Sequence, residues 1–462
     1  MSSLRNLPKH QHYAANYSRF GYFWGLGIEH ETYLATTQER IISSFKGQMR
    51  PERYCVNYYD AYKADSLQSM LQRVVDLSGS LAVPVLMNSH SFTKCDVSGE
   101  HATVYSTRPT PNPHFSGLTL FKYLCQHSQW LEEKVGTSYT WDGDTVEFTT
   151  QNFYRATVTD VLAELQETED RFIQEIRQAP PVGLLQSHGP LQLVAPVNEP
   201  WATYLTNPAN VSMFNNGTIH INVTLPTQLG FDRLPLWPAD FLEKHRRLAR
   251  LVQWLEPLWI AVHGSPDPFA SLSDRYAAGS QRLAVSRYIG LGTFDTEAMP
   301  IGKILQVPRS SVTAPWYDRL YAATDYTERS EIGLDINYNK HWAHGLELRF
   351  LDQLPLLNLQ EIMEQLVILM DIALASKSIS DPRSLPVWQE MAYEAIRHGS
   401  SWILTPTQRV ALGSAVGILE DQKEPMRPGD ALQWIFEQLE HRKGLCWSRM
   451  VERANSSWCC FF

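Results

Sequence analysis

Two glutamates, Glu29 and Glu31, stand two positions apart in a stretch from Gly25 to Leu34 that has the β-branched and aromatic residues of a strand. Side chains two apart on a strand project from the same face, so both carboxylates share one face. A sheet does not normally gather two acids on an inner face, because like charges repel and burying a lone carboxylate is costly. A hard divalent cation such as Mg²⁺ prefers oxygen ligands and removes this conflict. The pair therefore predicts either a cation site or a solvated outer face with two surface glutamates.

Three later strand-like stretches also place polar side chains together on one face. Glu147 lies on an alternating strand that follows an Asp-Gly turn signal, and His220 and Asn222 share the polar face of a strand that follows Asn-Gly. Glu347 and Arg349 form a third set, an acid and a guanidinium on one face. Each has an ordinary alternative, namely a surface carboxylate, a structural or exposed histidine, and a surface ion pair of little energetic value.

Helical periodicity indicates the elements that surround these strands. The spacing of apolar residues predicts helices over 116–135, 159–177, 241–263 and 356–377. From about residue 381 onward the pattern is helical only, over 385–398, 405–420 and 428–452. On the 159–177 helix the acids are most simply a solvated face: Glu164, Glu167, Glu169 and Asp170. We expect a mixed domain over 1–380 and a helical subdomain over 381–462.

Composition narrows the class of protein. The chain has 462 residues, of which 44% are hydrophobic and 19% charged, which is typical of a globular protein with a large core. A net charge of −9 without a Lys/Arg block argues against a general nucleic-acid binder. The six cysteines are scattered without a zinc or disulfide spacing, the N-terminus lacks a secretory h-region, and no long apolar run spans a membrane. We therefore expect a cytoplasmic protein without a transmembrane segment, and an oligomer is compatible with the sequence.

The polar strands occur in an order that resembles a known family. Glu29-His30-Glu31, Glu147 in a Val-Glu-Phe strand, His220 after Asn216-Gly217, and Glu347-Leu348-Arg349 followed by Asp352 are similar to the motifs of the glutamine synthetase-like carboxylate–amine ligases. The absence of a separate small N-terminal domain favours the glutamate–cysteine ligase branch. The resemblance covers roughly Phe23 to Leu357 through short motifs, and the glycine–histidine motif is one residue shorter than in glutamine synthetases.

The resemblance implies a fold and a set of residue roles. The fold is α+β, an antiparallel sheet curved into a half-barrel with helices outside, and ATP and Mg²⁺ or Mn²⁺ bind inside the concave face of the 1–380 catalytic domain. The implied metal ligands are Glu29, Glu31, Glu147 and Glu347. His220 lies beside the nucleotide phosphates, with Asn222 on the same face. Arg349 contacts the transferred phosphoryl group or the substrate carboxylate, so Arg349, Glu347 and His220 form the implied catalytic set.

The implied reaction is formation of an amide or peptide bond. ATP converts a carboxylate to an acyl phosphate, and an amine then displaces the phosphate, so that the protein mainly positions groups and neutralises charge. Further candidates for contact with the substrate or for a loop over the acyl phosphate are Arg282, Arg287 and Arg309. The expected substrate is a small molecule, namely glutamate or another amino acid, or a peptide. Two alternatives stay open: a guanidino-kinase-like phosphotransferase, and a binding protein that keeps the fold without catalysis.

Overall fold

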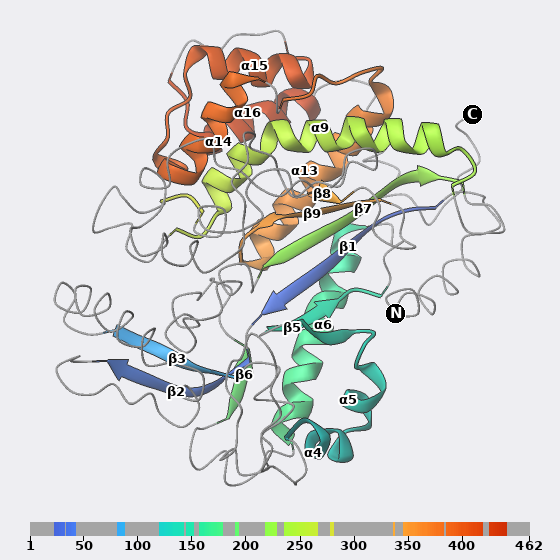
Figure 1. Ribbon diagram of the computed structural model, residues 1–462, viewed down its shortest axis with the longest axis vertical. Helices are drawn as coiled ribbons and strands as arrows, with labels where there is room; N and C mark the ends of the chain where they lie inside the picture. The colour runs from blue at the N-terminus through green and yellow to red at the C-terminus, as the bar shows by residue number, and fades with distance from the viewer. Residues whose placement is uncertain are drawn as a thin grey trace, which may run out of the picture.

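The computed structural model describes residues 23–32, 34–42, 81–87, 120–142, 145–151, 157–178, 190–193, 218–228, 235–266, 278–280, 336–337, 345–382, 385–418 and 425–440. These residues form an α+β fold around an open antiparallel sheet, as expected from the sequence (Figure 1). Among the helices in these ranges, none combines the length and apolar character needed to cross a bilayer.

The main sheet of the described region is antiparallel throughout. Its strands follow the spatial order β4 (Tyr139–Asp142), β5 (Thr145–Thr149), β1 (Phe23–Thr32), β7 (Ile219–Thr227), β9 (Leu346–Leu351) and β8 (Ile336–Asn337). A second sheet has the order β3 (Leu81–Met87), β2 (Leu34–Ile42) and β6 (Leu191–Leu193). The four polar stretches singled out above therefore lie on four neighbouring strands, β5, β1, β7 and β9.

The register of these strands aligns the polar residues across the main sheet. Glu31 is the cross-strand partner of Glu147, and Glu29 is the partner of His220. Asn222 stands opposite Glu347 on the other side of β7. Directly opposite residues in an antiparallel pair have their side chains on the same face. One face of the sheet is therefore lined by acids, an imidazole and an amide.

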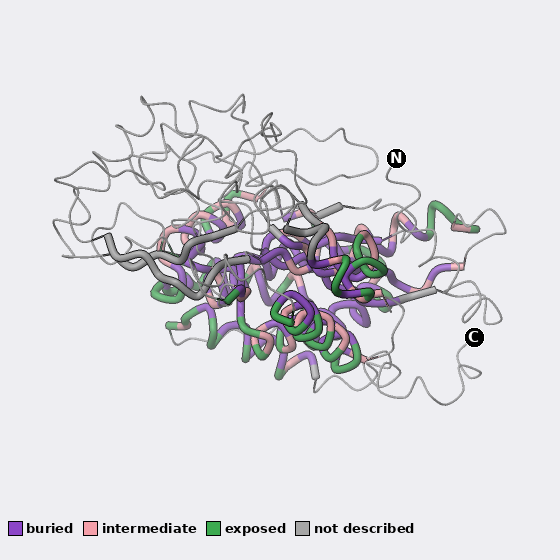
Figure 2. Tube along the Cα trace, turned by 90° about the horizontal axis from the view of Figure 1, so that it is seen from below, coloured by how far each residue is buried: buried purple, intermediate pink, exposed green. Residues whose placement is uncertain are grey.

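The other face of the main sheet is apolar and is covered by helices. Its side chains include Ile28, Ile221 and Leu348, all fully buried. Three helices contact this sheet or one another behind it: α6 (Val158–Gln178), α9 (Pro238–His263) and α13 (Leu356–Ala375). Figure 2 shows the buried residues as a continuous region through the middle of the described chain, with exposed residues at its margin. Burial of this apolar layer stabilises the sheet and so fixes the positions of the polar residues on its opposite face.

The predicted helix over 116–135 is two helices, α4 (Leu120–His127) and α5 (Gln129–Lys134). The division falls at Ser128, whose Oγ accepts a hydrogen bond from the backbone N–H of Leu131 at 3.1 Å and so caps the second helix. The same hydroxyl donates to the buried carboxylate of Glu175 on α6 at 2.6 Å. A side chain from α6 thus stabilises a helix start that apolar spacing alone does not reveal.

The C-terminal helices lie close to the rest of the described fold. They are α14 (Pro386–His398), the short 3₁₀ turn η5 (Gly399–Ser401), α15 (Pro406–Val416) and α16 (Pro428–Glu440). α14 and α16 both pack against α9, above the sheet in Figure 1. α15 begins with a capping box between Thr405 and Gln408, which satisfies backbone N–H groups at the helix start. The division of the chain at residue 380 into a catalytic domain and a helical subdomain stays a prediction.

Gly279 lies where the segment 278–280 crosses the end of α14, and we expect its replacement by alanine to destabilise the fold. The backbone N–H of Gly279 donates to the Ile396 carbonyl, and an added Cβ would lie 1.7 Å from the Ala395 carbonyl oxygen. Because the Ala395 carbonyl belongs to the backbone, this clash is relieved only if the segment 278–280 and the end of α14 move apart. We expect this movement to cost about 1–3 kcal/mol or more. The measurement is the urea-unfolding free energy of Gly279→Ala.

Gly429→Ala on α16 is the matched control, because the nearest atom to its added Cβ is 4.0 Å away. Alanine there should be neutral or stabilising by up to about 1 kcal/mol, as in other helices. Equal unfolding free energies for Gly279→Ala and the wild type would show that the close approach at α14 is readily relaxed.

Candidate metal centre

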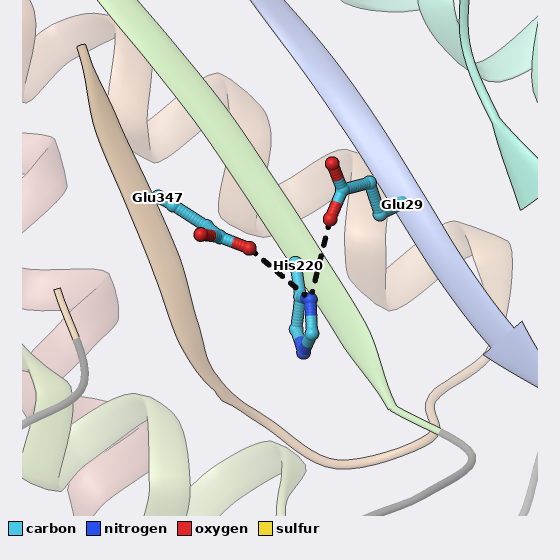
Figure 3. Close-up of side chains that lie close together, drawn as sticks. All are labelled: Glu29, His220 and Glu347. Atoms are coloured by element: carbon cyan, nitrogen blue, oxygen red, sulfur yellow. Dashed lines mark ion pairs between the residues drawn. The ribbon is translucent and has the colours of Figure 1, made fainter. Parts of the chain in front are cut away.

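A buried histidine on β7 lies between three glutamate carboxylates on the polar face of the main sheet. His220 Nδ1 is 3.5 Å from Glu29 Oε2 and 3.4 Å from Glu347 Oε1 (Figure 3). Its Nε2 is 3.9 Å from Glu31 Oε1. We call Glu29, Glu31, His220 and Glu347 the acid–histidine cluster; the Glu347 side chain is only 1% exposed. The structure therefore brings together four residues from three strands: Glu29 and Glu31 from β1, His220 from β7 and Glu347 from β9.

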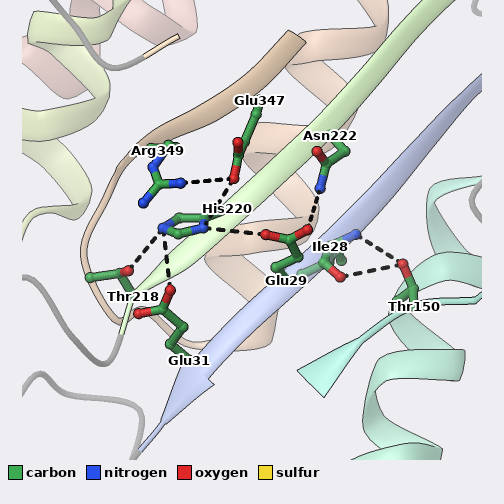
Figure 4. A network of polar contacts seen from close by, with 9 residues as sticks. All are labelled: Ile28, Glu29, Glu31, Thr150, Thr218, His220, Asn222, Glu347 and Arg349. Carbon is green, nitrogen blue, oxygen red and sulfur yellow. Dashed lines mark hydrogen bonds and ion pairs between the residues drawn. The ribbon is translucent and has the colours of Figure 1, made fainter. Parts of the chain in front are cut away.

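Three further polar side chains contact the cluster. Arg349 Nη1 donates to Glu347 Oε1 at 3.2 Å, and Asn222 Nδ2 contacts Glu29 Oε1 at 3.4 Å (Figure 4). Thr218 Oγ1 lies 3.2 Å from His220 Nε2. Asn222 and Arg349, both named from the sequence as candidates for nucleotide or substrate binding, thus hold the carboxylates from either side.

Thr150 fixes the backbone of β1 on the side that faces β5. The Thr150 hydroxyl accepts a hydrogen bond from the N–H of Ile28 at 2.9 Å, and the Thr150 N–H donates to the Ile28 carbonyl at 3.0 Å. Because Ile28 precedes Glu29, this contact anchors β1 to the end of β5 beside the acid–histidine cluster (Figure 4).

The charge of the acid–histidine cluster raises the pKa of His220. Burial disfavours the imidazolium and the Arg349 guanidinium repels it, so both lower the pKa. The carboxylates of Glu31, Glu29 and Glu347 favour the imidazolium and outweigh these effects. Without a metal ion, a proton on His220 therefore partly neutralises the gathered acids. A metal ligand must be the neutral imidazole, so a divalent cation would replace that proton.

The donor atoms fit a single metal ion. One ligand atom each from Glu29, His220 and Glu347 lie within 4.8 Å of one another. Donors bound to one cation at about 2.0–2.1 Å stand roughly 3–4 Å apart, which matches the separations from His220 Nδ1. Carboxylates suit Mg²⁺ and Mn²⁺, whereas imidazole is a softer ligand that Mg²⁺ uses less readily. The mixed set makes Mn²⁺ the better probe of this site.

Glu147 lies next to the cluster through its strand register. It is the cross-strand partner of Glu31, and its side chain is only partly buried. Like charges directly opposite one another in a sheet are destabilising unless a cation lies between them. The register is therefore compatible with the predicted role of Glu147 as an additional metal ligand.

The structure also reveals polar contacts that the sequence did not indicate. Asp352, which follows β9, accepts hydrogen bonds at its Oδ2 from the Ser265 N–H at 2.8 Å and from the Ser280 hydroxyl at 2.9 Å. This carboxylate ties the ends of α9 and of the segment 278–280 to the strand that carries Glu347. The three predicted substrate-contact arginines, Arg282, Arg287 and Arg309, lie outside the described residues. No local signal in the sequence links Asp352 to either serine.

Fold and site together define an α+β protein with an open antiparallel sheet, one face of which carries a buried acid–histidine cluster capable of holding a metal ion. No protein-family model matches the chain. The chain is 33% identical over 426 residues to the uncharacterized protein R704 of Acanthamoeba polyphaga mimivirus, an alignment that covers 90% of this chain and 74% of the relative. The chain belongs to the same family as this viral protein.

Proposed function

We propose that the protein is an ATP-dependent carboxylate–amine ligase of the glutamine synthetase-like type, nearest in kind to the glutamate–cysteine ligases. The observation that carries this proposal is the meeting of Glu29, His220 and Glu347 on one sheet face, with their ligand atoms within 4.8 Å. The strands that carry these residues, β1, β7 and β9, are neighbours in the sheet in the same order as their motifs occur in the family's sequences. Curvature of the sheet into a half-barrel is part of the proposal.

A bound Mg²⁺ or Mn²⁺ would supply neutralising charge for ATP phosphate oxygens during formation of an acyl phosphate. Glu29, His220 and Glu347 would hold one cation, and Glu31 with Glu147 would offer carboxylates for another. Donor type and spacing support the first of these sites, and Asn222 keeps Glu29 oriented through its amide. The second site is supported by the strand register that pairs Glu31 with Glu147. ATP and the substrate are proposed from the resemblance of the motifs.

Arg349 is the proposed residue for the charged groups that react. Its side chain is 26% exposed, while the Glu347 side chain that it contacts is almost completely buried. The contact with Glu347 thus fixes one edge of the guanidinium. A planar guanidinium presents several N–H groups in a rigid fork, the geometry that matches phosphate or carboxylate oxygens.

Burial of the acids supports a cation-dependent role over binding by the fold alone. Glu29, Glu31 and Glu347 are each at least nine-tenths buried on the same face. Gathering like charges away from water is costly unless a cation compensates them. The guanidino-kinase alternative shares the cation requirement but stops at phosphoryl transfer, so it is separated from the ligase by its product.

The test is hydroxamate formation with ATP, Mn²⁺ or Mg²⁺, hydroxylamine, and a pool of amino acids and dicarboxylates. Hydroxylamine replaces the unknown amine and captures an acyl phosphate. We expect an ATP-dependent hydroxamate that falls by about 10²–10³-fold in Arg349→Ala, the usual effect of losing a positioned donor. Phosphoryl transfer to an acceptor without hydroxamate would support a phosphotransferase. A protein that binds neither nucleotide nor metal would overturn the proposal.

A further inference from the structure

A second polar group lies behind the metal centre, within the apolar face of the main sheet. His30 alternates with Glu29 and Glu31 on β1, so its side chain points to the helix-covered face. There its Nδ1 lies 2.5 Å from Glu169 Oε1 of α6, and its Nε2 lies 2.9 Å from Gln353 Oε1. Glu169, expected on a solvated helix face, is only 17% exposed. The solvated-face interpretation is therefore wrong for Glu169.

The hydrogen-bond directions in this group are fixed by one carbonyl. Gln353 Nε2 donates to the backbone carbonyl of Glu31, which can only accept. The Gln353 amide oxygen therefore faces His30, and the His30 Nε2 must donate to it. His30 Nδ1 faces a carboxylate, so both ring nitrogens of His30 donate when Glu169 is ionised. The hydrogen bonds therefore run without a break from Glu169 through His30 and Gln353 to the Glu31 carbonyl.

This group joins two strands that are not neighbours. β7 separates β1 from β9, and β1 and β9 run in the same direction because each is antiparallel to β7. Gln353 follows β9 by two residues and contacts β1 at both His30 and Glu31, across the start of β7. Gln353 therefore links β1 directly to the segment after β9, in addition to the hydrogen bonds that each of these strands makes with β7.

We propose that Glu169, His30 and Gln353 form a positioning clamp that fixes the separation of the metal-binding carboxylates on β1 and β9. This inference rests on the proposed cation site in the acid–histidine cluster. The three residues lie on the opposite face from the cluster or beyond its strands, so they act through the backbone and do not contact the metal. Outer partners that hydrogen-bond to metal ligands typically change metal affinity by about 10–100-fold when removed. Gln353 bonds to the backbone of the cluster residue Glu31, so we expect an effect of this order.

The test compares Mn²⁺ binding by Gln353→Leu and Glu169→Gln with that of the wild type. Glu169→Gln keeps the size of the side chain and removes its charge, so it protects the test against a failure of Gln353→Leu to fold. The matched control is Glu167→Gln, an exposed acid on the same helix. Free Mn²⁺ is measured by electron paramagnetic resonance, and thermal unfolding of the metal-free proteins is followed by circular dichroism.

We expect Mn²⁺ affinity to fall about 10–100-fold in both clamp variants and to be unchanged in Glu167→Gln. Lowered unfolding temperatures with wild-type Mn²⁺ affinity would show a merely structural role and overturn the clamp. A wild-type protein that binds no Mn²⁺ would overturn the clamp and the cation site together. Mn²⁺ binding that depends on the clamp, without any hydroxamate product, would leave the clamp standing and remove the ligase proposal.

Discussion

Replacing Glu347 by glutamine is expected to abolish measurable Mn²⁺ binding and ATP-dependent hydroxamate formation. Glu347 is buried, contacts His220 Nδ1 at 3.4 Å and accepts from Arg349 at 3.2 Å. Glutamine keeps the shape but removes the negative charge that both a cation and the guanidinium require. We expect Mn²⁺ affinity to fall by more than about 100-fold, the upper limit typical of outer partners alone.

The same loss should be visible without any activity assay. A ligand that binds only the folded protein stabilises it, by about 2.7 kcal/mol at a hundredfold excess over its dissociation constant. Mn²⁺ should therefore raise the unfolding temperature of the wild type and leave that of Glu347→Gln unchanged. Glu390→Gln, at an exposed acid of α14, is the control and should respond as the wild type does. An equal Mn²⁺ response in Glu347→Gln would place the metal elsewhere.

Replacing His263 by leucine is expected to reduce the sensitivity of the protein to acid. His263 lies at the end of α9, and burial lowers its pKa to about 4. Neither of its ring nitrogens has a hydrogen-bond partner among the residues that the structure describes. The fold therefore holds an imidazole that is neutral, and leucine of similar bulk can occupy the position without titrating.

The sign of the effect follows from proton uptake by the unfolded chain. As the pH falls below about 6.5, the unfolded histidine binds a proton that the folded one does not, so stability falls. The loss continues until the folded His263 titrates, and the interval from 6.5 to about 4 corresponds to about 3 kcal/mol. By pH 5 we expect about 2 kcal/mol of this difference between His263→Leu and the wild type, relative to pH 7.5.

Urea unfolding of both proteins at pH 7.5 and pH 5 measures this difference. His30 and His220 act in the opposite direction. Burial lowers the pKa of each, but Glu169 for His30 and the surrounding carboxylates for His220 raise it overall. The stabilisation that these two histidines contribute is complete below about pH 6.5 and is lost as the pH rises through their raised pKa values. Because the wild type and His263→Leu both contain them, this contribution cancels in the comparison. Exposed His127→Leu is the control, and parallel pH profiles for wild type and His263→Leu would contradict the prediction.

The alternation of polar and apolar residues was sufficient to predict the faces of the main strands. Ile28 and Ile221 are fully buried on the helix side, while Glu29, Glu31 and His220 lie on the other face, as period-two spacing requires. The resemblance of the motifs predicts that these strands contribute to one site, and the strand pairing brings Glu29, His220 and Glu347 together. The register that sets Glu29 opposite His220 depends on contacts between distant segments, which a local pattern does not contain.

The residues that support the strands of the cluster could not be predicted from the sequence for the same reason. Glu169 shares a helix with several acids and carries no sign that distinguishes it from Glu167, because its difference arises from the approach of His30. Gln353 and Asp352 follow a strand and resemble an ordinary loop start, although they bond to β1 and to the ends of α9 and the segment 278–280. Ser128 divides a helix through a contact with Glu175 that lies 47 residues later.

The wide sequence separation of the residues in the acid–histidine cluster and in the clamp behind it determines when this site can form during folding. Asn222 and Glu29 are 193 residues apart, and His30 and Gln353 are 323 apart, although each pair is in contact. Closing such loops carries an entropic cost that must be met before the contacts stabilise the chain, which slows formation of non-local sheets. During synthesis on the ribosome, β1 emerges long before β9 and has no access to Glu347. A cation at this centre can therefore secure the completed fold but cannot nucleate its early stages.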